Sequence, residues 1–188
     1  GVSPHKIGIY MKLETLQEHL ITTNNYLEMY SETLEFGKPS YYNKFLTRKK
    51  VNVPGIYKIE IRLSSFTKNK LNWKKDFEEY WDIHKGQGKR TPSSKKGRLK
   101  QHDNEANNEW IPLYIGRSLK VKERLELHRD TPFEKPYQAL KLQDRGIFVS
   151  KNFRVSFLEL PKENYEIISH YVEDYFREKI NPIVGNKG

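Results

Sequence analysis

Side chains suited to phosphate chemistry recur along the chain at spacings that place them on regular elements. Arg124 and His128 stand four positions apart in a helical pattern, so both belong to one helix face. Glu173 lies within a second helical pattern, and Tyr57 and Tyr114 lie in strand-like segments. A guanidinium offers a planar fork to phosphate, and a carboxylate can hold a Mg²⁺ ion that keeps several waters. These residue types suit phosphodiester hydrolysis, which needs an activated water and stabilised charge on phosphate oxygens.

The elements that must position these residues are predicted from hydrophobic periodicity. Alternation predicts a strand over 53–63, and shorter apolar runs predict two more. Spacings of three, four and seven between apolar residues predict the helices. We expect strands over 53–63, 110–116 and 153–160, and helices over 11–34, 77–83, 118–129, 136–142 and 162–179. The fold class expected is α/β (α+β), a small three-stranded sheet flanked by helices.

Composition narrows the class of protein. The 188 residues carry 34 Lys and Arg against 24 Asp and Glu, a net charge of +10. Such a charge favours a polyanionic partner, with nucleic acid first, because neutralised phosphates release counterions. A basic protein that merely stays in solution is the alternative. No segment approaches the roughly 20 apolar residues of a membrane span, so no membrane partner is expected.

The chain has no cysteine. This excludes disulfide scaffolds, cysteine nucleophiles and Cys-ligated zinc, and it fits a reducing compartment. The N-terminal residues have no apolar core followed by a cleavage site, so no signal peptide is expected. Met11 is a candidate natural start, with residues 1–10 as an added segment. The localisation expected is cytoplasmic.

Two tripeptides carry a resemblance to a known family. Residues 55–57 (Gly-Ile-Tyr) open one expected strand, and residues 114–116 (Tyr-Ile-Gly) end the next. The later residues at matching spacing are Arg124, His128, Glu173 and Asn186. In this order the motifs resemble the GIY-YIG endonuclease family over roughly residues 53–186, apart from an insertion. A second Gly-Ile-Tyr at 8–10 is set aside because no amphipathic strand follows it.

The resemblance implies a fold, an activity and a set of roles. It implies the GIY-YIG fold, with an antiparallel sheet, and one divalent ion, Mg²⁺, in each active site. Tyr57 would be the general base, with its pKa lowered beside the metal and Arg124. Tyr114 and His128 would position phosphate or water, and Glu173 would hold the metal. The catalytic set implied is Tyr57, Tyr114, Arg124, His128, Glu173 and Asn186, with Asn186 in an architectural role.

The chain departs from the family between the two tripeptides. Typical members join them by a short hairpin, whereas Tyr57 and Tyr114 here stand 57 positions apart. We expect an N-terminal helical segment at 1–48 and a nuclease domain at 49–188, with an insertion at about 66–109. The basic stretch 84–100 is expected to be a flexible DNA-contacting arm, and a solvated loop without a role is the alternative. The DNA-binding residues expected are Lys85, Lys89, Arg90, Lys95, Lys96, Arg98, Lys100, Arg117 and Lys122.

The leading functional hypothesis is a Mg²⁺-dependent, site-specific endonuclease of restriction type that cuts double-stranded DNA. The chain ends just past Asn186, and its additions to the core are the N-terminal helical segment and the insertion. We expect no separate DNA-reading domain, which resembles the restriction members of the family. A homing or mobile-element nuclease domain and an inert DNA-binding module are the alternatives. One active site cuts one strand, so a double-strand break predicts a homodimer or two sequential cuts. The leucine stripe over 11–34 would supply the dimer contact or cover the sheet.

Each candidate residue also has a purely structural interpretation. Tyr57 and Tyr114 can be ordinary sheet aromatics, and His128 can complement a helix dipole. Arg124 and Glu173 can lie on solvated helix faces. No rival nuclease motif competes, because the 102–104 sequence (His-Asp-Asn) lacks the further ligands of an HNH site.

Overall fold

The computed structural model describes residues 12–84, 86, 90–102 and 108–185. Its four strands form one antiparallel sheet in the order β1-β4-β2-β3. They are β1 (Ser40–Tyr41), β2 (Gly55–Arg62), β3 (Trp110–Ser118) and β4 (Phe153–Glu159). The three predicted strands are present, but the expected count of three is wrong, because β1 also pairs with β4. Two residues are too few for alternation to indicate a strand.

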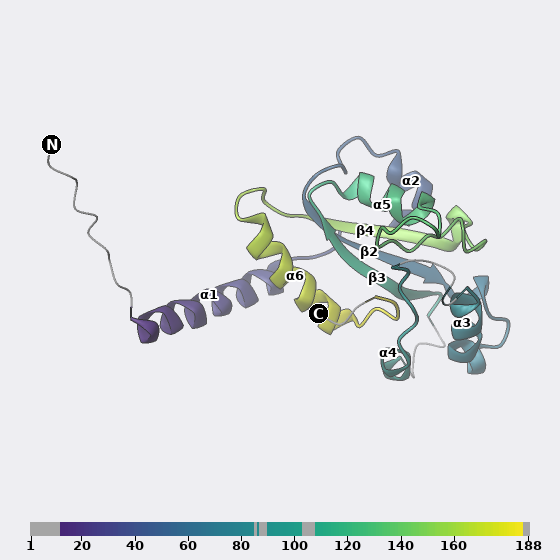
Figure 1. Cartoon of the computed structure of the whole chain (residues 1–188), viewed down its shortest axis with the longest axis horizontal. Coiled ribbons are helices and arrows are strands. Elements are labelled where there is room, and N and C mark those ends of the chain that lie inside the picture. The colour runs from purple at the N-terminus through teal and green to yellow at the C-terminus, as the bar shows by residue number, and fades with distance from the viewer. Residues whose placement is uncertain (1–11, 85, 87–89, 103–107, 186–188) are drawn as a thin grey trace, which may run out of the picture.

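Six helices accompany the sheet in the described part of the chain. They are α1 (Leu13–Thr33), α2 (Tyr42–Leu46), α3 (Trp73–Asp82), α4 (Lys96–Gln101), α5 (Val121–Asp130) and α6 (Tyr165–Ile180). Figure 1 shows α2 and α5 on one side of the sheet, and α6 on the other. The structure is therefore a mixed α+β fold, as the sequence predicts at that level.

The two faces of the sheet bury different hydrophobic clusters. The larger cluster contains Tyr57, Ile59 and Ile61 of β2, together with residues of α2, α3 and α5. On the opposite face, Ile56 and Ile115 pack beneath α6. This alternation along β2 follows from the two-residue period of a strand. It directs Tyr57 toward α5 while α6 covers the other face.

Helix α1 contacts the remainder of the fold only near its C-terminal end. Tyr30 and Leu34 pack against the cluster beneath α6, whereas Leu13, Leu16 and Leu20 are exposed. Figure 1 shows the N-terminal part of α1 projecting away from the other elements. The leucine stripe therefore does not cover the sheet. Among the described residues, no helix combines the length and apolar character needed to cross a membrane.

Two expectations about secondary structure are wrong. Residues 136–142 form no helix, because Lys141 has a left-handed φ of 56°, which a right-handed helix cannot contain. Residues 90–100 are not simply a flexible loop, because α4 begins within them and Ser94 forms a bridge with Val184. The expectations for residues 8–10, Met11, Lys85, Lys89 and Asn186 lie outside the described residues.

Candidate active site

The two tyrosines of the tripeptides lie together because β2 and β3 are neighbours. Tyr57 pairs with Gly116, and Ile59 pairs with Tyr114, in an antiparallel register. Both rings point to the same face of the sheet, and their centroids are 6.2 Å apart. Sheet pairing therefore brings the two tyrosines together even though the insertion separates them by 57 residues.

His128 is buried behind Tyr57, and its hydrogen bonds assign its tautomer. The backbone N–H of Leu140 donates to Nδ1, at 3.0 Å. Burial lowers the pKa of His128 well below its usual range, and Arg124 lowers it further, so the ring is neutral. A neutral imidazole that accepts at Nδ1 carries its proton on Nε2. Nε2 therefore donates to the Tyr57 hydroxyl oxygen, at 2.7 Å.

The expected lowering of the Tyr57 pKa beside a metal stays a prediction, and the protein's own groups shift this pKa in the opposite direction. Burial raises this pKa well above its usual range, and neighbouring Tyr114 raises it further, while Arg124 opposes the shift. A buried phenolate loses the hydration that stabilises its charge. Tyr57 is therefore a neutral phenol whose oxygen accepts a hydrogen bond from His128. Its own hydroxyl proton is not donated to His128.

Arg124 is held beside both tyrosines. Its guanidinium Nη2 donates to the Gln138 carbonyl, at 2.6 Å, and the guanidinium interacts with the hydroxyls of Tyr57 and Tyr114. The segment that supplies Gln138 also supplies Leu140, the donor to His128. Residues 138–140, which follow α5, thus orient both functional side chains of that helix.

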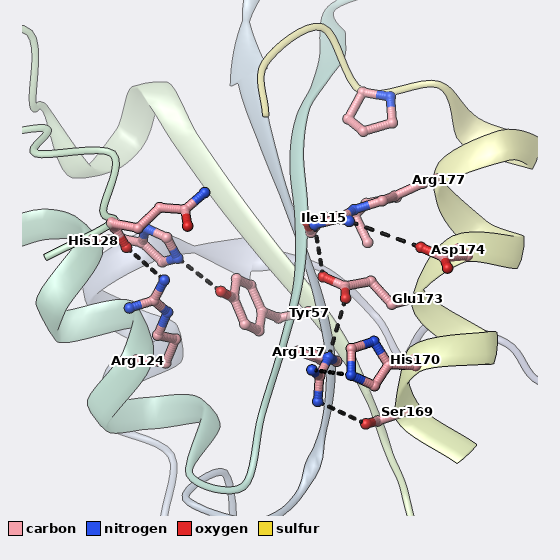
Figure 2. A network of polar contacts seen from close by, with 12 residues as sticks. Tyr57, Ile115, Arg117, Arg124, His128, Ser169, His170, Glu173, Asp174 and Arg177 are labelled. Carbon is pink, nitrogen blue, oxygen red and sulfur yellow. Dashed lines mark hydrogen bonds and ion pairs between the residues drawn. The ribbon is translucent and has the colours of Figure 1, made fainter. Parts of the chain in front are cut away.

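Glu173 reaches the same site from α6. Its side chain is 9% exposed, and two arginines neutralise it. Arg117 Nε lies 3.3 Å from Oε2, and Arg177 Nη2 lies 2.8 Å from Oε1. Burial raises the pKa of the Glu173 carboxyl, while Arg177 and Arg117 oppose the rise. Figure 2 shows these ion pairs and the Tyr57–His128 contact on opposite sides of one strand.

Arg117 is further restrained by its neighbours on α6. Its Nη1 donates to Glu166 and Ser169, both at 3.1 Å, and its Nη2 lies 2.6 Å from His170 Nε2. Arg117 directly follows the second tripeptide in the sequence. The network joins the end of β3 to three successive turns of α6.

One cleft of about 780 Å³ collects most of the predicted catalytic residues. Its lining includes Tyr57, Tyr114, Arg117, Arg124 and Glu173. His128 is not on its surface but supports Tyr57 from behind. The cleft therefore presents phenols, guanidiniums and a carboxylate to one shared, solvent-open volume.

The predicted DNA-binding residues separate into groups. Lys95, Lys96 and Arg98 line a second groove between α4 and α6. Lys100 is exposed on α4, Arg90 is exposed before it, and Lys122 is half-buried on α5 away from the cleft lining. Among the members of this set that the structure describes, only Arg117 lies in the cleft with the catalytic residues.

Sequence reasoning missed Arg177, which lines both the cleft and the groove. Its spacing of four from Glu173 on a predicted helix is the signal that points to an ion pair. Gln138 and Leu140 act through backbone atoms, so their side-chain identities carry no such signal.

A single buried carboxylate such as Glu173 is suited to a hard divalent ion that keeps several waters, such as Mg²⁺. In the described residues, no group of three or more His, Asp or Glu side chains is placed to hold a metal. Mg²⁺ commonly binds through one or two carboxylates and completes its shell with waters and substrate phosphate oxygens. Glu173 fits that pattern when one of its carboxylate oxygens is released from its arginine partner.

In comparisons with models of protein families, with curated proteins and with solved structures, no match to the chain was found. The resemblance to the GIY-YIG family therefore depends on the tripeptides and on the later residues of the motif.

Proposed function

We propose that the protein is a Mg²⁺-dependent endonuclease of GIY-YIG type that hydrolyses phosphodiester bonds in double-stranded DNA. The observation that carries this proposal is the shared cleft, into which β2, β3, α5 and α6 each contribute a residue of the predicted set. The net charge of +10 supports a polyanionic substrate.

The chemistry assigns a task to each side chain. Arg124 offers its guanidinium to the scissile phosphate, where charge develops during hydrolysis. The Tyr57 hydroxyl orients the attacking water, and His128 orients that hydroxyl by donating to its oxygen from Nε2. Glu173 would hold Mg²⁺, which supplies positive charge to the phosphate and to the leaving oxygen. Tyr114 completes the wall opposite α6.

Phosphate contacts beyond the cleft extend over α4. The groove between α4 and α6 holds Lys95, Lys96 and Arg98 close to the cleft, because both volumes share Asp174 and Arg177. This favours the DNA-contacting interpretation of the insertion over that of a loop without a role. The proposed class is a site-specific restriction-type enzyme, and a homing or mobile-element nuclease domain is the alternative.

A homodimer is part of the same proposal. Leu13, Leu16, Leu20 and Leu27 follow spacings of three, four and seven along α1, the pattern of a two-helix seam. Leu13 is 64% exposed and Leu20 is 53% exposed, on the part of α1 that projects from the fold. A second copy offers the same stripe, and its active site would cut the second DNA strand.

The test compares cleavage of plasmid and long phage DNA with Mg²⁺ or with EDTA. Three proteins are needed: the wild type, Glu173→Ala, and the control Glu163→Ala, which removes an exposed carboxylate just before α6. We expect discrete fragments from the wild type and the control only with Mg²⁺, and none from Glu173→Ala. DNA binding, measured by fluorescence anisotropy, should persist in Glu173→Ala, because the basic surface is intact.

Each other outcome selects a different function. Smeared or nicked products that require Mg²⁺ and Glu173 would favour the homing or mobile-element alternative. Binding without any cleavage would favour an inert DNA-binding module. Cleavage that survives in Glu173→Ala would remove Glu173 from the mechanism.

A further inference from the structure

Arg177 occupies a position that no motif indicates. Its Nη2 lies 2.8 Å from Glu173 Oε1 and 3.4 Å from the Ile115 carbonyl oxygen. Its Nη1 lies 3.9 Å from Asp174 Oδ1, and the side chain is 16% exposed. Figure 2 shows Arg177 extending from α6 toward the strand that carries Ile115, above the Glu173 carboxylate. The guanidinium is thus anchored at the carboxylate and yet open on one side.

The open side connects two concave volumes. Arg177 and Asp174 line both the catalytic cleft, of about 780 Å³, and the α4–α6 groove, of about 940 Å³. The opposite wall of the groove carries Arg98, which donates to the Pro182 carbonyl at 3.0 Å. Burial and the charge of Arg177 both lower the pKa of Arg98, so the two guanidiniums repel each other across this region. The groove lining carries four basic side chains against the two carboxylates of Asp174 and Glu178, so it is suited to an anion.

Glu173 is a poor ligand for a divalent cation while it is paired in this way. Both carboxylate oxygens already contact guanidinium nitrogens, from Arg117 and from Arg177. A cation placed at either oxygen would lie beside two positive charges in a partly buried site, where repulsion is weakly screened. The metal site that the proposed function needs is therefore weakened in the free protein.

A DNA phosphate offers Arg177 a better partner than the carboxylate. Guanidinium–phosphate pairs form two parallel hydrogen bonds and match the planar fork of arginine. The groove brings phosphates to Arg177 from the side opposite Glu173, because Lys95 and Lys96 line the same volume. Transfer of Arg177 to a phosphate would leave Glu173 paired only with Arg117.

We propose that Arg177 is a phosphate-binding residue with two alternative partners, Glu173 in the free protein and a DNA phosphate in the α4–α6 groove. The exchange frees a Glu173 oxygen for the divalent ion when substrate is bound. This inference rests on the proposed nuclease function and adds a condition to it. By linkage, DNA raises the affinity of Glu173 for metal, and metal raises the affinity for DNA by the same factor.

Mn²⁺ is the probe, because its binding can be followed by electron paramagnetic resonance without catalysis. Titrations use the Tyr57→Phe protein, which keeps DNA intact, with and without sheared phage DNA. In the absence of DNA, Arg177→Gln should raise the Mn²⁺ affinity about 10-fold, within the usual range of coupling between sites. In the parent protein, DNA should raise that affinity by a similar factor, and in Arg177→Gln the effect of DNA should largely disappear.

The matched control is Lys179→Gln. Lys179 lies on the same helix and carries the same charge, but its Nζ contacts Tyr175 rather than Glu173. Its removal should leave Mn²⁺ affinity unchanged. Arg177→Lys serves as a second variant, because it keeps the charge and loses the fork, and it should give an intermediate affinity. Arg117 still neutralises Glu173 in each Arg177 variant, which keeps the buried charge paired.

Two results would overturn the inference, and they differ in what they say about the proposed function. Mn²⁺ binding that Glu173→Gln abolishes and Arg177→Gln leaves unchanged would refute the exchange but retain the metal site. If no Mn²⁺ binding depends on Glu173, with or without DNA, both the exchange and the metal-dependent nuclease fail.

Discussion

The Tyr57 hydroxyl occupies the space that a side chain at Gly116 would need. A Cβ at this position would lie 2.6 Å from Tyr57 Cζ, closer still to its hydroxyl oxygen, and 2.8 Å from Tyr114 Cε1. Real Cβ atoms essentially never approach other atoms within 3.0 Å. The glycine of the second tripeptide therefore allows the tyrosines of both tripeptides to lie over β3. The need for glycine is a matter of space at the site.

Gly116→Ala should displace both tyrosines and abolish cleavage. Overpacking of this kind costs about 1–3 kcal/mol of stability. In the Tyr57→Phe background, where the nearest atom is missing, the same substitution should cost less. Urea denaturation of the four proteins of this double-mutant cycle measures the difference. Equal costs in both backgrounds would show that the Tyr57 hydroxyl is not what excludes a side chain at Gly116.

Gly55→Ala should destabilise the fold rather than act on the site alone. A Cβ at Gly55 would lie 3.3 Å from the Leu158 carbonyl carbon and closer still to its oxygen, and both atoms belong to the backbone of β4. Backbone atoms in a paired strand cannot turn aside as a flexible side chain can. We expect a loss of about 1–3 kcal/mol in urea denaturation. A loss below about 0.5 kcal/mol would contradict the tight β2–β4 approach.

The buried, neutral state of His128 predicts a dependence of stability on pH. Its pKa is lowered on folding, so the unfolded chain binds the proton more readily. The stability contributed by the neutral ring is present above the unfolded pKa of about 6.5, and it is lost as the pH falls toward the folded value. The loss approaches about 1.4 kcal/mol for each pH unit in that interval.

Denaturation curves at pH 5 to 8 test this prediction, with His128→Asn compared to the wild type. The wild type should lose stability on acidification below about pH 6.5, and the variant should lose less. His19→Asn, on exposed α1, is the matched control and should behave as the wild type does. Parallel curves for His128→Asn and the wild type would mean that His128 does not titrate differently on folding.

Helix α4 should contribute to the salt dependence of DNA binding. Lys96 and Lys100 are exposed on α4, which Asn181 and Pro182 anchor beside α6. Each lost phosphate contact should reduce the slope of log affinity against log salt by about 0.9. The combined Lys96→Gln and Lys100→Gln protein should therefore lose about 2 units of slope. Lys75→Gln, on exposed positions of α3, should leave the slope unchanged. An unchanged slope in the α4 variant would mean that α4 makes no phosphate contacts.

The leucine stripe of α1 should determine the oligomeric state. Leu20→Glu places a charge in the proposed two-helix seam and should convert a dimer to a monomer in analytical ultracentrifugation. Thr22→Glu places the same charge on the opposite side of α1 and should leave the dimer intact. A wild type that sediments as a monomer at micromolar concentrations would exclude the α1-mediated dimer.

The sequence by itself determined the elements whose side-chain periodicity is local. The strands over 55–62, 110–118 and 153–159 and the helix α6 all lie within a few residues of their predicted ranges. Alternation and helical spacing arise from backbone geometry, which each segment carries independently of its neighbours. The sequence also indicated a single site, through the order in which the two tripeptides are followed by Arg124, His128 and Glu173.

Tertiary structure decided what depends on residues distant in the chain. Strand β1 exists because β4 pairs with it, and residues 138–140, which form no helix, are held through their backbone by Arg124 and His128. The pKa of Tyr57 rises because the surrounding fold removes water from it. The pairing of Glu173 with both Arg117 and Arg177 likewise requires β3 and α6 to meet. Burial and charge are sums over neighbours in space, and the linear sequence does not specify those neighbours.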